Sequence, residues 1–196
     1  MKWLHFITMK YSKVWLTPDE VKALFAIPEL PESYETWLYM LYFPGLRVTE
    51  ATYVRLMDLD EKAECINIYK GKGRNGELQR VPCEPHVLRR IKRYCEHHNL
   101  KPKDYVMFSN KGERVHRSHV YRVVNQLCKQ AKIDKRIGTH TFRRSRAEHL
   151  LDNGLELTYV SKFLRHKNLS TTMAYLDISV SDIQRELEKI EMPVIV

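Results

Sequence analysis

The stretch CINIYKGKGRNGELQRVPC, residues 65–83, decides the fold class of this chain. Its two ends, residues 65–69 and 78–83, are short runs rich in apolar residues, bounded by turn residues, as is typical of β-strands. Between them, Gly71, Gly73 and Gly76 alternate with Lys72 and Arg74 in a flexible, basic turn. The stretch therefore predicts a β-hairpin with a basic tip.

Outward from this hairpin, the pattern is helical in both directions. Upstream, Thr17-Pro18-Asp19-Glu20 combines an N-cap threonine, a first-turn proline and a glutamate three residues after the cap, so a helix begins here. Further helices are predicted at residues 34–43, 46–55, from 85 onward, 118–132, 140–153, 157–164, 171–176 and 181–191, with a short strand at 106–108. The expected fold class is mainly α with a small antiparallel β-sheet (α+β), in one domain spanning residues 15–196 after a tail or linker remnant at 1–14.

The composition excludes several classes of protein. Of the 196 residues, 43% are hydrophobic and 29% are charged, a balance that supports a packed core rather than a disordered chain. Charges interrupt every apolar run, so neither a membrane span nor a secretory signal is predicted. The four cysteines are widely spaced, and the pair His116 and His119 lacks a third ligand nearby, so we expect reduced thiols in a cytoplasmic protein and no metal.

Positive charge is concentrated in the middle of the chain. Residues 70–146 hold 21 basic and 6 acidic side chains, a net charge of +15, whereas the segments on either side are each at −3. Such a block attracts a polyanion, because neutralising phosphates releases their condensed counterions. Double-stranded DNA is the natural partner, although a solvated basic face that aids solubility would have the same composition.

Four short motifs occur along the chain, and their order and spacing are informative about function. They are Gly45-Leu46-Arg47-Val48-Thr49-Glu50, the hairpin Gly71-Lys72-Gly73, His140-Thr141-Phe142-Arg143, and Leu164-Arg165-His166 followed nine residues later by Tyr175. Over residues 17–190 the chain resembles the catalytic domain of the tyrosine recombinase (phage integrase) family. The resemblance implies that family's DNA breaking-rejoining fold and a catalytic set of Arg47, Lys72, His140, Arg143, His166 and Tyr175.

The two arginines suit phosphate chemistry on chemical grounds alone. Displacement at a phosphodiester builds charge on the non-bridging oxygens, and the planar forks of Arg47 and Arg143 can each bond such oxygens at two points. Glu50 lies one helical turn after Arg47, so the two residues can form an ordinary ion pair, which is compatible with a supporting role of Glu50 in orienting the guanidinium group.

The remaining roles come from the resemblance. Tyr175 would be the nucleophile, although a phenol with a pKa of about 10 is almost entirely protonated at neutral pH and needs neighbouring cations. His140 would accept or orient its proton, His166 would bond the phosphate, and Lys72 would protonate the leaving oxygen. The alternatives are structural histidines, a half-buried aromatic side chain and a turn lysine that contacts the DNA backbone.

The chain departs from the family pattern at two positions. The family usually has Gly before the second His and often has His after the second Arg, where this chain has Arg165 and Arg144. We therefore expect that the turn at Arg165 does not need a positive φ. Arg165 and Arg144, together with Arg74, Arg117 and His119, are predicted to contact DNA.

The resemblance implies a site-specific recombinase or integrase that cleaves DNA through a 3′-phosphotyrosyl intermediate, with no metal, ATP or other cofactor. It also implies a monomer in solution and a homotetramer on DNA, where helix 181–191 either docks on a neighbouring protomer or packs on its own domain. Family members usually carry an additional N-terminal DNA-binding domain, so the chain is either a catalytic fragment or a single-domain form.

Viral genome integration is one of several possible roles. The alternative functions are DNA relaxation of the type IB topoisomerase kind and a non-catalytic DNA-binding regulator on the same fold.

Overall fold

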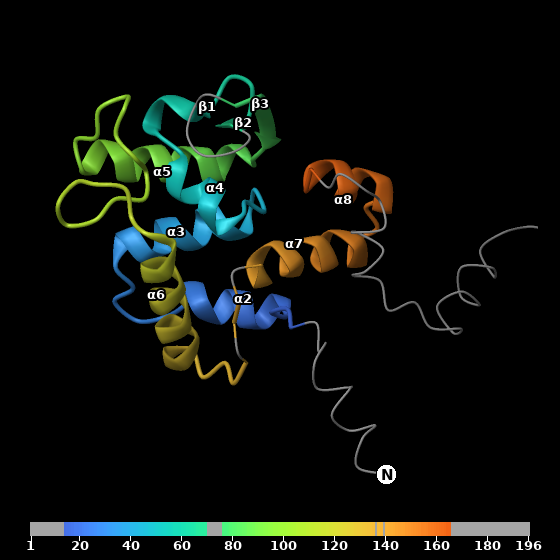
Figure 1. Ribbon diagram of the computed structural model, residues 1–196. Helices are drawn as coiled ribbons and strands as arrows, with labels where there is room; N and C mark the ends of the chain where they lie inside the picture. The colour runs from blue at the N-terminus through green and yellow to red at the C-terminus, as the bar shows by residue number, and fades with distance from the viewer. Residues whose placement is uncertain (1–13, 70–75, 136, 139, 166–196) are drawn as a thin grey trace, which may run out of the picture.

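The computed structural model describes residues 14–69, 76–135, 137–138 and 140–165 of the chain. Figure 1 shows these residues as a helical body with a small sheet at one end. The helices predicted at 171–176 and 181–191 lie outside the described residues, as does the tip of the hairpin.

Among the described residues, which begin at residue 14, three α-helices precede the sheet. The first, α2 (Pro18–Phe25), begins as predicted: the Glu20 amide donates to Thr17 Oγ1 at 3.2 Å, and Glu20 Oε2 accepts the Thr17 amide at 2.7 Å. The second and third are α3 (Glu32–Tyr42) and α4 (Val48–Tyr53), which are separated by the turn at Pro44-Gly45. This turn delivers the first motif to the start of α4.

The predicted hairpin is present as part of a three-stranded antiparallel sheet. Its strands are β1 (Leu59–Asp60), β2 (Cys65–Tyr69) and β3 (Leu78–Pro82), in the order β1-β2-β3. Ile66 lies opposite Leu59 on one side and Val81 on the other. The additional strand, β1, follows the short 3-10 helix η2 (Leu56–Asp58) and was not predicted.

Within the described residues after the sheet, up to Arg165, the structure has four helices: α5 (Pro85–His97), α6 (Arg117–Gln130), α7 (Thr141–Asp152) and α8 (Leu157–Phe163). Each agrees with its predicted position to within two residues at the ends that were predicted. The strand predicted at residues 106–108 is wrong. This segment instead makes separate contacts, in which the Val106 amide donates to the Val54 carbonyl and the Met107 carbonyl accepts the Val115 amide.

The core surrounds α3, whose Leu38 and Met40 are fully buried. Helix α3 packs against α5 and α7, and Figure 1 shows α5 with the sheet on one side of α3 and α2 on the other. A smaller apolar cluster of Ala147, Val160 and Leu164 joins α8 to α7. This second cluster fixes the end of α8 beside the turn that precedes α4.

All four cysteines are buried and free, in agreement with the prediction of reduced thiols. Burial raises the pKa of the Cys83 and Cys95 thiols to about 12 and that of Cys128 to about 11. These thiols are therefore protonated and unreactive at neutral pH. Among the described residues, no helix combines the length and the apolar character that crossing a bilayer requires.

Candidate active site

The first arginine of the predicted site caps a helix. Arg47 is the N-cap of α4, and its backbone amide donates to Glu50 Oε2 at 2.8 Å. Its guanidinium also pairs with Glu50, with 2.6 Å between Arg47 Nη1 and Glu50 Oε1. The Arg47 side chain is 40% exposed, so the carboxylate orients the guanidinium while leaving part of it open to a ligand. Both interpretations of the Arg47–Glu50 pair are thus compatible in one geometry.

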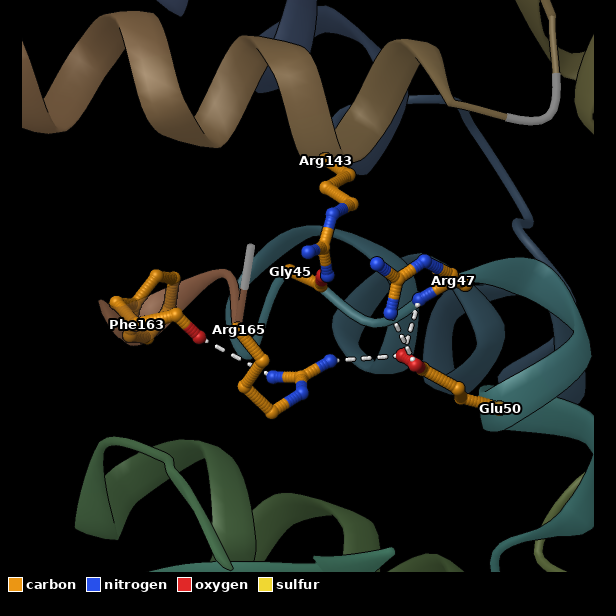
Figure 2. Close-up of polar contacts among 6 residues, drawn as sticks. All are labelled: Gly45, Arg47, Glu50, Arg143, Phe163 and Arg165. Atoms are coloured by element: carbon orange, nitrogen blue, oxygen red, sulfur yellow. Dashed lines mark hydrogen bonds and ion pairs between the residues drawn. The ribbon is translucent and has the colours of Figure 1, made fainter. Parts of the chain in front are cut away.

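The second arginine reaches the same turn from a different helix. Arg143 lies in the first turn of α7 and is only 2% exposed. Its Nη1 donates to the carbonyl oxygen of Gly45 at 2.8 Å. Gly45 is two residues from Arg47, and Figure 2 shows the two guanidinium groups converging over this turn. The structure therefore brings together two arginines that are 96 positions apart in the sequence.

Gly45 allows this close approach. Its φ is +57°, in the left-handed region, and a Cβ at this position would lie 3.1 Å from Leu164 Cδ2 and 3.3 Å from Phe163 Cε1. No amino acid other than glycine fits both this backbone conformation and the small space beside the Cα atom. The glycine lets the end of α8 pack directly onto the turn that carries Arg47.

His140 lies beside the two arginines as the N-cap of α7. Burial of part of the ring lowers its pKa, and the charges of Arg143, Arg47 and Arg144 lower it further, against a smaller opposing effect of Glu50. The ring is therefore neutral at neutral pH. A neutral imidazole close to an anion site can accept a proton, as the predicted role of His140 requires.

The prediction that the turn at Arg165 does not need a positive φ was wrong. The residue has φ = +55°, so the turn after α8 does adopt the left-handed conformation that a glycine would favour. The side chain provides the compensation. Arg165 Nη2 pairs with Glu50 Oε2 at 2.7 Å, and its Nη1 donates to the Phe163 carbonyl at 3.1 Å.

The other predicted DNA contacts differ in their surroundings. Arg117 is exposed at the start of α6, and Arg144 is half-buried on α7. His119 is half-buried and packs edge-on against Trp37, with 5.7 Å between the ring centroids. These positions stay predictions as DNA contacts. Of the remaining predicted site residues, Lys72, Arg74, His166 and Tyr175 lie outside the described residues.

Arg114 also lies beside α4, at a position that no sequence motif predicted. Its guanidinium stacks over the Tyr53 ring, 4.1 Å from the centroid, and donates to Thr52 Oγ1 at 3.2 Å. Together with Arg117 it lines a pocket of about 280 Å³ beside α4. Its place in the basic central segment was the available signal, but no motif distinguished it from the other arginines there.

One group of described residues has a donor set suited to a metal ion. Glu32, His97 and His98 each offer a ligand atom within 4.8 Å of the others. The His97 side chain is 73% exposed, and its Nδ1 lies 2.8 Å from Glu32 Oε2. That distance is shorter than the roughly 3.3 Å that separates the ligand atoms of a tetrahedral zinc site with bonds of about 2.0 Å. A surface hydrogen bond accounts for this contact.

The fold and the arginine-lined site define a domain suited to binding a phosphate group of a polyanion. Comparison with known proteins gives a specific assignment. Residues 14–181 match the Phage integrase family, and the chain belongs to that family.

Similar proteins agree with this assignment. A tyrosine recombinase of Thermosipho africanus is 36% identical over 167 residues, which cover 84% of this chain and 57% of the relative. The tyrosine recombinase XerD of Staphylococcus epidermidis is 31% identical over 192 residues, with 91% of this chain and 63% of the relative covered. The chain thus spans about three fifths of the length of these relatives.

Solved structures show the same fold. The crystal structure of XerA recombinase superposes with a TM-score of 0.77 at 24% identity, covering 91% of this chain and 65% of that one. XerH site-specific recombinase bound to its difH substrate superposes with a TM-score of 0.72 at 20% identity, covering 88% and 53%. The architecture is therefore that of a tyrosine recombinase catalytic domain, as predicted.

Proposed function

We propose that this chain is the catalytic part of a site-specific DNA recombinase. The observation that carries the proposal is the meeting of Arg47 and Arg143 at one turn, with His140 beside them. Two fixed, permanently charged donors suit the phosphate of a DNA backbone, on which negative charge builds during displacement. Membership of the phage integrase family supports this choice of substrate over other phosphate esters.

The reaction is an exchange of phosphodiester bonds. The Tyr175 oxygen attacks the phosphorus and forms a 3′-phosphotyrosyl bond, while the bond to the 5′ oxygen breaks and that oxygen leaves as a hydroxyl. His140 accepts or orients the phenolic proton, Lys72 supplies the proton for the leaving oxygen, and His166 bonds the phosphate. A 5′-hydroxyl of a partner duplex then reverses the attack. The bond energy is conserved, so the exchange needs no ATP.

The partners follow from this chemistry. Double-stranded DNA is the substrate, and four protomers on two duplexes form the complete assembly, with the protein acting in the cytoplasm. Two of the structural relatives, the XerH complex and the Tn1549 transposon integrase, were solved with DNA, which supports DNA binding by this chain. Viral genome integration, dimer resolution and transposition are roles that the same exchange can serve.

A suicide substrate tests the proposal directly. A duplex nicked next to the scissile phosphate releases a short fragment after cleavage, so the protein–DNA adduct accumulates and is visible on a denaturing gel. The native chain should form this adduct, and Tyr175→Phe should form none while binding the duplex with similar affinity. A native chain that binds the duplex tightly and never forms the adduct would favour a non-catalytic DNA-binding role instead.

A further inference from the structure

Arg165 occupies a backbone conformation that normally favours glycine. It follows Leu164, the C-cap of α8, at φ = +55°, and its amide donates to the Lys162 carbonyl at 2.9 Å, in the manner of a helix C-terminal cap. A long side chain in this conformation costs free energy that glycine would not cost. Lys132 has the same conformation after α6, with φ = +57°, so the role of Arg165 has to be inferred from its side-chain contacts rather than from its backbone conformation.

The Arg165 side chain is held inside the site. It is only 10% exposed, in contrast to the 40% of Arg47. Its two terminal nitrogens bond Glu50 Oε2 and the Phe163 carbonyl, as Figure 2 shows. With its fork engaged by protein oxygens, Arg165 is poorly placed to reach a DNA phosphate itself.

Glu50 is shared between two cations. Its Oε1 pairs with Arg47 at 2.6 Å, and its Oε2 accepts both the Arg47 amide and Arg165 Nη2. Burial would raise the pKa of Glu50, but the charge of Arg165 and the hydrogen bonds from Arg47 hold it below its usual value. The carboxylate is thus ionised, and the trio carries a net charge of +1.

This sharing has a consequence for Arg47. With Glu50 as its only partner, Arg47 would form a neutral pair with little positive charge left to stabilise the negative charge that builds on the phosphate during displacement. The second cation leaves an uncompensated positive charge beside the exposed part of Arg47 and fixes the carboxylate at both oxygens. The ion pair between Arg165 and Glu50 also connects the chain immediately before His166 to the helix that begins after Arg47.

We propose that Arg165 is a positioning residue that acts through Glu50 to keep Arg47 oriented and positively charged toward the scissile phosphate. The proposal rests on the proposed recombinase function. It assigns Arg165 a role in the cleavage rate rather than in DNA affinity.

The test is a double-mutant cycle in the full chain with Arg165→Gly, Glu50→Gln and the combined variant. Single-turnover adduct formation on the nicked duplex, the dissociation constant for that duplex and the melting temperature are measured for each protein. Arg165→Gly should slow adduct formation roughly 10- to 100-fold, as a misplaced catalytic group does. Its DNA affinity should stay within about 2-fold, and its melting temperature within about 3 °C, because relief of the backbone strain offsets the lost ion pair.

In the Glu50→Gln background, the same substitution should change the rate by less than about 3-fold, because the residues act as one unit. Arg165→Lys, which keeps the charge but loses the two-point contact, should fall between the native chain and Arg165→Gly. The matched control is Lys162→Ala, which removes an exposed charge from α8 without touching Glu50 and should leave the rate unchanged.

Three results would overturn the proposal: an unchanged rate for Arg165→Gly, a loss that is equally large in both Glu50 backgrounds, or a loss of affinity with a salt slope smaller by about 1, which indicates a direct phosphate contact. Complete absence of adduct with the native chain would instead refute the recombinase function. In that case the melting temperatures of the four proteins still decide the Arg165–Glu50 link, since additive shifts would refute it.

Discussion

At the scale of single residues, the two arginines of the site have different physical settings. Arg47 is part-exposed and pairs with Glu50 in the same helical turn, whereas Arg143 is buried and bonds a backbone carbonyl of a distant turn. Their predicted contribution to catalysis is the same, but their contributions to folding are not. The sequence could not distinguish them, because neither short motif shows which groups surround its arginine in the folded chain.

Alanine substitution should reveal this difference. Arg47→Ala and Arg143→Ala should each slow adduct formation by about 10²–10³, as the loss of one oxyanion donor does. Arg143→Ala should also lower the free energy of unfolding by about 1–3 kcal/mol, because it leaves the Gly45 carbonyl without this donor. Arg47→Ala should change it by less than about 1 kcal/mol. Urea unfolding of both variants is the measurement, and equal losses of stability would contradict the different settings.

Gly45 offers a second test at this scale. Gly45→Ala should lower stability by the roughly 1–2 kcal/mol of a left-handed alanine, plus the cost of displacing Leu164 and Phe163. Gly154→Ala is the matched control, since Gly154 has φ = +84° and nothing within 4 Å of an added Cβ. The difference between the two variants in urea unfolding measures the close approach alone. If Gly45→Ala lowered the free energy of unfolding by no more than Gly154→Ala, the close packing of α8 against this turn would be contradicted.

At the scale of elements, local sequence signals gave most of the helices. The capping box at Thr17 and Glu20 forms as predicted, because its hydrogen bonds involve only residues three positions apart. Strand β1 was missed because two residues are too few to show a period. Residues 106–108 are apolar like a strand, but their backbone partners are single residues: Val106 bonds the distant Val54, and Met107 bonds Val115 across a short local turn. A tertiary contact such as the one with Val54 leaves no local pattern.

The contact between α3 and α7 predicts a pH dependence of stability. The Tyr42 hydroxyl lies 2.8 Å from His149 Nδ1, and burial raises the pKa of Tyr42, so the hydroxyl donates and the imidazole accepts. Burial also lowers the pKa of His149 below its usual value. Protonation of His149 is therefore less favourable in the folded state than in the unfolded state. Stability should be highest above the unfolded-state pKa of about 6.5 and should fall as the pH drops below it.

Urea unfolding at pH 7.5 and at pH 5.5 measures this loss. His149→Asn retains a polar side chain without a titrating proton, so its stability should change less between the two pH values than that of the native chain. Part of the dependence will remain, because His140 has a lowered pKa of the same sign. An identical loss in the variant and in the native chain would exclude His149 as a source.

At the scale of the whole molecule, the structure shows where some of the positive charge of the central segment lies. The central segment with its net charge of +15 supplies Arg143 to the turn at Arg47, as well as Arg114 and Arg117 to the pocket beside α4. The sequence predicted a polyanion partner from this block, yet it could not show which of the arginines share one face. That depends on the packing of α4 against α6, which no local pattern encodes.

The placement of Arg117 on the same side of the molecule as α4 leads to a prediction about DNA affinity. Arg117 is exposed and borders the pocket lined by Thr49 and Thr52 of α4, the helix that begins after Arg47. A phosphate contact at this position would release about one counterion, so Arg117→Gln should weaken binding to duplexes of any sequence and reduce the salt slope of the affinity by about 1. Fluorescence anisotropy across a series of salt concentrations is the measurement.

Lys22→Gln is the control, because Lys22 is equally cationic but lies on α2, paired with Asp19, outside the basic segment. If both substitutions reduced the slope equally, DNA would respond to the total charge of the molecule rather than to a defined basic face.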